Sequence, residues 1–140
     1  MKTLRIILIT VLILYGAGSL IGAIVSLFDQ AKQAEWQHLG AMTPGLEKLM
    51  LLSGAVLAGQ VWLYFSAIAL LVRNMKEGYM YAVTLGFIEL IQAIVIVWAL
   101  SAHNFGSATD YFALLKGLVL LILALVAFKK SSSMFKPVAA

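Results

Sequence analysis

The chain has 140 residues, of which 63% are hydrophobic and 11% are charged, and its mean hydropathy is +1.01. Soluble domains are about half apolar and about a quarter charged, so this composition excludes an ordinary water-soluble domain and indicates a lipid environment. The chain contains no cysteine, which excludes disulfides and thiolate metal sites.

The first apolar segment predicts a transmembrane helix at about residues 4–28. A signal peptide is the alternative, but its apolar core spans only about 7–15 residues, and this run continues well beyond that length. Gly18, Gly22 and Ser26 recur at every fourth position. Small residues at this spacing let membrane helices approach closely, so they predict a packing face, either within the bundle or between copies of the chain.

The second and third segments predict helices at about residues 47–73 and 79–102, joined by a tight turn at Gly78. Glu89 lies near the middle of the third segment, where a charge costs about 2.5 kcal/mol or more. We therefore expect its carboxyl group to face the bundle interior and to be protonated or paired. Gln92 lies one turn further along the same face, and the short turn places Gln60 of the second segment at the level of Gln92.

The fourth segment predicts a helix at about residues 109–129, followed by a mobile cytoplasmic tail at 131–140. Lys116 interrupts this helix. Counted from the tail end at about 1.5 Å per residue, Lys116 lies near the depth of Glu89, and so does Tyr15 of the first helix. Counted from the other end, Lys116 lies nearer the outer surface, where it would extend its ammonium group towards the headgroups.

Together the segments predict an all-α fold, a polytopic membrane protein with a single four-helix domain over residues 1–130. Short connections make neighbouring helices antiparallel, which gives an up-down-up-down bundle. Basic residues occur before the first helix, between the second and third, and after the fourth, whereas the connection HNFGSATD has none. The first connection has Lys32 and Lys48, which are balanced by Asp29, Glu35 and Glu47. By the positive-inside rule both termini are cytoplasmic. This explains the net charge of +4 without a nucleic-acid partner and is compatible with a bacterial inner membrane.

The polar residues at similar depth define a predicted ligand- or proton-binding site. Its members are Tyr15, Gln60, Glu89, Gln92 and Lys116. The alternative for the glutamines is a structural clasp of hydrogen bonds between helices, each of which contributes about 0.6 kcal/mol. Tyr64 is interpreted, with the other aromatic residues, as a packing or interfacial side chain.

No motif in the sequence predicts a metal or a cofactor. His38 and His103 have no partner residue in view, so neither a bis-histidine haem site nor a metal cluster is expected. Phosphate-binding glycine loops and the motifs of common hydrolases are missing from the sequence as well.

Three classes of function remain. The first is a binding or accessory protein that holds a lipid or other apolar small molecule, or that docks a larger membrane complex. The second is a proton-coupled transporter or channel, homo-oligomeric, in which Glu89 exchanges a proton. The third is an enzyme on a lipid-embedded substrate, for which Glu89 and Lys116 are the available acid–base pair. We rank them in this order because a binding protein needs the least special chemistry.

A mid-membrane glutamate in a chain of four spans resembles the small multidrug transporters, in which such a carboxylate alternately binds protons and cationic drugs. In this chain the glutamate lies on the third helix rather than the first, and the first connection is long. The basic residues also favour one orientation, unlike the dual-topology members of that family. The chain is not assigned to that family, and no residue role is carried over.

Overall fold

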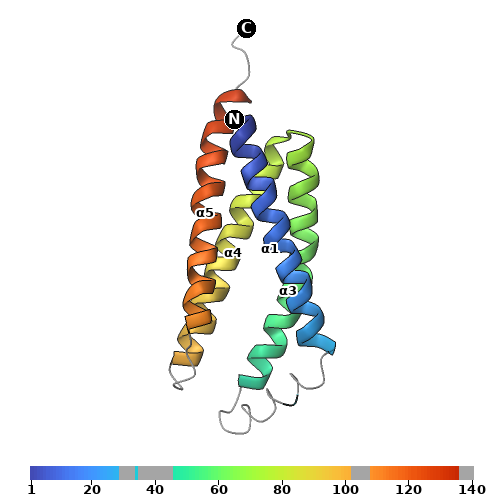
Figure 1. Cartoon of the computed structure of the whole chain (residues 1–140), viewed down its shortest axis with the longest axis vertical. Coiled ribbons are helices and arrows are strands. Elements are labelled where there is room, and N and C mark those ends of the chain that lie inside the picture. Colours follow the sequence, from blue (N-terminus) through green and yellow to red (C-terminus); the bar gives the residue numbers. More distant parts are fainter. Residues whose placement is uncertain (29–33, 35–45, 102–107, 136–140) are drawn as a thin grey trace.

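The computed structural model describes residues 1–28, 34, 46–101 and 108–135. These residues form four long helices, α1 (Lys2–Phe28), α3 (Leu46–Val72), α4 (Lys76–Ser101) and α5 (Ala108–Met134) (Figure 1). Each contains a stretch long and apolar enough to cross a membrane. A helix of 27 residues such as α1 is about 40 Å long, which exceeds the bilayer core of about 30 Å. The predicted all-helical architecture with four candidate spans is confirmed.

The helices alternate in direction along the chain. Both described ends of the chain and the α3–α4 turn lie at one end of the bundle, as Figure 1 shows. The most extensive contact joins α4 to α5, followed by α1 with α3 and α3 with α4, whereas α1 and α5 touch little. The bundle therefore consists of two helix pairs joined through α3 and α4.

The turn between α3 and α4 is made by an asparagine. Asn74 has a φ of 56°, the left-handed conformation that ends many helices. The amide of Met75 donates to the carbonyl of Leu70 at 2.9 Å, and that of Asn74 to Leu71 at 3.0 Å. This is the Schellman arrangement, in which one left-handed residue satisfies the last carbonyls of a helix.

Gly78, which the sequence places in this turn, lies instead in the first turn of α4. A Cβ atom there would lie 2.8 Å from the backbone nitrogen of Leu71. Its role is therefore close packing of α4 against the end of α3.

The helix α5 extends to Met134, beyond its predicted end near residue 129, so residues 131–134 of the predicted tail are helical. The hydroxyl groups of its serines are satisfied within the helix. The hydroxyl groups of Ser131 and Ser132 donate to the carbonyl of Phe128 at 2.7 and 2.9 Å, and Ser133 donates to Lys130 at 2.7 Å. Hydroxyl groups that bond to the preceding turn need no other partner. Residues 136–140 lie outside the described residues.

The core is apolar and so is much of the outer surface. Buried leucines, alanines and two tyrosines from all four helices fill the interior, among them Leu12, Ala82 and Leu120. Outward-facing apolar side chains are largely exposed, including Leu14 at 65% and Phe65 at 72%. Contiguous exposed apolar surface on this scale marks a membrane or partner contact.

Candidate functional site

The position of Glu89 follows from the buried face of α4. Ala82, Leu85, Gly86, Glu89 and Ala93 are all buried and recur at the three- and four-residue spacing of one helix face. Glu89 is 6% exposed. Its carboxyl group is therefore held inside the bundle by the same periodicity that places the core residues.

Both oxygens of the Glu89 carboxylate have a partner on another helix. The hydroxyl of Tyr64 on α3 donates to Oε1 at 2.6 Å, and Nζ of Lys116 on α5 lies 3.1 Å from Oε2. A buried charge is tolerated when it is paired and hydrogen-bonded in this way. The structure thus joins α3, α4 and α5 through one carboxylate.

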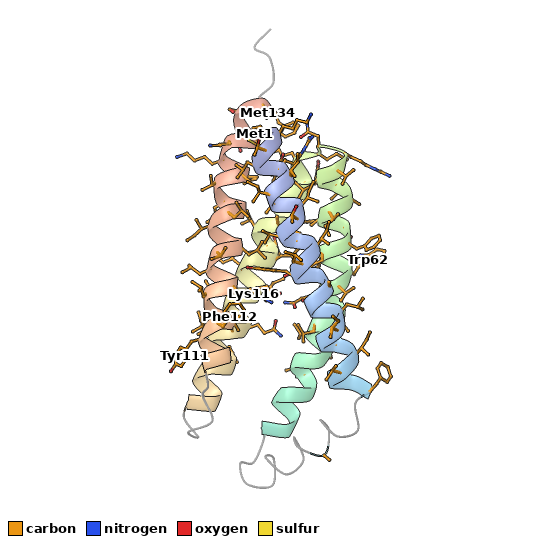
Figure 2. All side chains as sticks on the ribbon, viewed as in Figure 1. Met1, Trp62, Tyr111, Phe112, Lys116 and Met134 are labelled. Carbon is orange, nitrogen blue, oxygen red and sulfur yellow. The ribbon has the colours of Figure 1, made fainter. Side chains whose placement is uncertain are left out.

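A close approach of α5 to α4 places Lys116 beside Glu89. A Cβ atom on the adjacent Gly117 would lie 2.8 Å from the backbone nitrogen of Leu90 and 3.1 Å from the carbonyl carbon of Glu89. Only glycine allows the two backbones to be this close. Figure 2 shows Lys116 about midway along the bundle, and of its two predicted depths the structure shows the one level with Glu89.

Tyr15 connects α1 to the same group. Its hydroxyl donates to the backbone carbonyl of Lys116 at 3.2 Å, and the Lys116 ammonium lies 4.9 Å from the centre of the Tyr15 ring. An ammonium group at this distance from an aromatic face is attracted to it. The Lys116 side chain is 27% exposed and that of Glu89 is 7% exposed, so the pair is accessible from the lysine side.

The two glutamines pair with each other one turn away. Nε2 of Gln60 donates to Oε1 of Gln92 at 3.0 Å and links α3 to α4, in agreement with the prediction that the two glutamines lie at the same level. Gln60 is 2% exposed, and its own carbonyl oxygen has no hydrogen-bond partner among the described residues. The structure links Tyr15, Lys116 and Glu89 in one group and Gln60 with Gln92 in a second group one turn away. These two groups, on four helices, are called the polar cluster below.

Tyr64 and Ser19 belong to this cluster, although sequence analysis did not select them. Ser19 is 2% exposed, and its hydroxyl lies beside Tyr64 but meets no partner at hydrogen-bonding geometry among the described residues. A signal for Tyr64 was present, because it lies four residues after Gln60 and hence on the same face of α3. Aromatic side chains in membrane helices commonly serve in packing, so the polar role of its hydroxyl was not predicted.

The predicted small-residue face of α1 lies partly against α3. A Cβ atom on Gly22 would lie 3.3 Å from Cδ1 of Leu57, whereas one on Gly18 would have no atom within 4 Å. The closest approach is at Gly16, where a Cβ atom would lie 3.1 Å from that of Tyr64. The side chain of Ser26 is outside the described residues, and the role of the whole stripe stays a prediction.

An apolar groove of about 420 Å³ lies next to the polar cluster, between α1 and α3. Ile13 and Leu20 line it on α1, and Phe65 and Ala69 on α3, with Tyr64 at its base. Tyr64 lines the groove, and its hydroxyl bonds to Glu89. Tyr64 is therefore shared by the apolar groove and the polar cluster.

Among the described residues, no group of three or more histidine, aspartate or glutamate side chains is placed to hold a metal ion. His38 and His103 lie outside the described residues. The described contacts of the cluster are hydrogen bonds and the ion pair between Glu89 and Lys116. No protein-family model, curated protein or solved structure matches this chain.

Proposed function

We propose that this chain is an integral membrane protein of the binding or accessory type, which holds a lipid or other apolar small molecule beside Glu89. The observation that carries the proposal is the groove of about 420 Å³ with Tyr64 at its base. Ligand pockets have volumes of about 300–1,000 Å³ and combine apolar walls with a few polar groups. An apolar chain in the groove would lie against Tyr64, which is hydrogen-bonded to Glu89.

The ionisable pair supports a functional role for this cluster. Two amides would suffice to clasp α3 and α4, and Gln60 with Gln92 already provides such a bond. Glu89 and Lys116 are more expensive in a membrane than amides. A ligand that interacts with Tyr64 or with the Glu89 carboxylate would explain why the chain carries an ionisable pair at this position despite its free-energy cost.

The proposed location is a bacterial inner membrane, with both termini in the cytoplasm. Of the described basic residues, six lie at the end of the bundle that carries the termini, namely Lys2, Arg5, Arg73, Lys76, Lys129 and Lys130, whereas Lys116 lies midway along α5 and Lys48 lies in the first turn of α3 at the other end. The positive-inside rule assigns such an end to the cytoplasmic face.

Native mass spectrometry after mild detergent extraction tests the proposal. We expect wild-type protein to retain a small-molecule adduct, and both Glu89→Gln and the groove-filling variant Ala69→Leu to lose most of it. Ala58→Leu is the matched control, because Ala58 is also an exposed alanine of α3 and does not line the groove. Adducts of equal intensity in all four proteins, or bare protein throughout, would contradict the proposal. They would favour a structural clasp or a partner complex lost in purification.

A proton-coupled transporter is the second candidate, and the contact between Glu89 and the more accessible Lys116 favours it. Protonation of Glu89 would release the lysine, so a proton and a cation could compete for one carboxylate. In proteoliposomes with an imposed pH gradient and a trapped pH-sensitive dye, this function predicts proton flux that Glu89→Gln abolishes. Equal dye signals in wild type and in empty liposomes would exclude it.

A further inference from the structure

A second cavity lies at the end of the bundle where the first residue of the chain meets the end of α5. Its volume is about 200 Å³ and it is lined by Met1, Lys2, Arg5, Asn74, Tyr79 and Met134. Figure 2 shows Met1 and Met134 next to each other at this end. The cavity is remote from Glu89, and the function proposed above makes no use of it.

The polar side chains of this cavity are hydrogen-bond donors or cations, and no carboxylate lines it. Arg5 offers a planar fork of N–H groups that matches phosphate oxygens in pairs. Lys2 adds an ammonium group. Tyr79 is fully buried and lines the cavity together with Arg5. Asn74 is the left-handed residue of the Schellman turn. The hydrogen bonds of that turn fix the backbone that carries its side-chain amide.

The positive charge at this end is not neutralised within the described part of the chain. Six basic residues lie there, and Glu77 is the one described acidic residue near them. The ion pair that the described residues form is that of Lys116 with Glu89, so neither Lys2 nor Arg5 has a carboxylate partner among them. A bound anion would relieve the repulsion between these cations.

We propose that this cavity binds a phosphate group, supplied by the headgroup of an anionic phospholipid. A space of about 200 Å³ is smaller than a pocket for a drug-sized molecule and suits a headgroup rather than a whole lipid. Helices about 40 Å long have their ends at the headgroup level of a bilayer about 40–45 Å thick. Basic pockets between helices on the cytoplasmic side bind such headgroups.

The test is a titration of dioleoyl-phosphatidylglycerol into the full-length protein in a neutral maltoside detergent, followed by native mass spectrometry. We expect Arg5→Gln to weaken the affinity about tenfold or more, as for the loss of hydrogen bonds to a charged group. Lys2→Gln removes an exposed cation, so it perturbs folding least. It should weaken the affinity about fivefold.

Lys129→Gln is the matched control, because it removes one exposed positive charge from the same end without touching the cavity. It should change the affinity less than about threefold, as expected for a distant screened charge. If Lys129→Gln weakens binding as much as Arg5→Gln and Lys2→Gln, the lipid responds to overall charge and the cavity proposal is overturned.

Competition with inorganic phosphate tests whether the bound phosphate group belongs to a lipid headgroup or to a soluble compound. Failure of millimolar phosphate to displace the lipid supports a headgroup site. Displacement by phosphate in wild type but not in Arg5→Gln would keep the cavity as a phosphate site and assign it to a soluble phosphate compound instead. Binding of neither ligand to wild type would overturn the proposal, and the Glu89 groove would be unaffected by that result.

Discussion

At the scale of single residues, Glu89 organises the interior of this bundle. Its two carboxylate oxygens contact Tyr64 and Lys116, and Tyr15 contacts that lysine in turn. Breaking a buried ion pair by removing one partner is strongly destabilising, because the remaining charge is left without compensation. Glu89 and Lys116 therefore depend on each other within the bundle.

The two tyrosines should differ in their contribution to stability. Tyr64→Phe removes a 2.6 Å hydrogen bond to a carboxylate, and we expect it to lower the free energy of unfolding by about 1.5–3 kcal/mol. Tyr15→Phe removes a 3.2 Å bond to a neutral carbonyl and keeps the ring near Lys116, so about 0.5–1 kcal/mol is expected. Unfolding in mixed micelles with increasing dodecyl sulfate, followed by circular dichroism, measures both. A larger loss in Tyr15→Phe would refute this ranking.

The sequence predicts that Glu89 is buried and lies near Gln92, because an ionisable side chain within an apolar helix almost always faces the bundle interior. It does not predict that Tyr64 is the partner of Glu89. Which hydroxyl reaches the carboxylate depends on how α3 is rotated about its axis, and that rotation is set by packing such as the contact of Gly16 with Tyr64.

At the scale of helices, two glycines let α4 and α5 pack with their backbones nearly in contact. A Cβ atom on Gly86 would lie 2.6 Å from Cα of Leu121, and one on Gly117 would lie 2.8 Å from the nitrogen of Leu90. In a lipid solvent close packing replaces the hydrophobic effect as the force between helices. These two positions therefore set the distance that brings Lys116 to Glu89.

Alanine substitutions at glycines should separate into two groups. Gly86→Ala and Gly117→Ala force backbones apart, and we expect each to lower the unfolding free energy by about 1–3 kcal/mol. Gly18→Ala and Gly59→Ala are controls, because an added Cβ would meet no atom within 4 Å and alanine is the better helix former by about 1 kcal/mol. Thermal unfolding in detergent measures all four variants. Destabilisation by Gly18→Ala would instead indicate that this face packs against another chain.

Gly18 and Gly22 are conspicuous in the sequence because of their four-residue spacing, whereas Gly86 and Gly117 have no such pattern. Gly86 and Gly117 lie on different helices, so no spacing along the chain relates one to the other. Their role in close packing becomes visible only when α4 and α5 lie side by side.

At the scale of the whole molecule, the basic end and the apolar flanks define how the bundle should sit in a membrane. Many exposed side chains along the helices are apolar, for example Leu14 and Trp62, and the described basic residues other than Lys116 and Lys48 lie at the end that carries both termini. The positive-inside rule then predicts one orientation.

Cysteine labelling can test that orientation without background, because the chain has no cysteine. In intact bacterial cells an impermeant maleimide should label Gln37→Cys, which lies in the connection predicted to be external. It should label Ser133→Cys, near the end of α5, only after the inner membrane is permeabilised. The reverse pattern would invert the topology, and labelling of both in intact cells would mean that the chain inserts in two orientations.

The sequence by itself determined the number, approximate bounds and apolar character of the helices. These properties are local, since about 20 consecutive apolar residues are enough to favour a spanning helix. It also determined that Glu89 is buried, that Gln60 and Gln92 are level, and that one end of the bundle is basic.

Only the tertiary structure decided which groups meet. It chose Tyr64 as the partner of Glu89, placed Lys116 at the inner of its two predicted depths, assigned the turn to Asn74 and formed the two cavities. The physical reason is that rotation and spacing of packed helices arise from contacts between residues far apart in the chain. Periodicity along one helix identifies a buried face but does not identify what lies opposite.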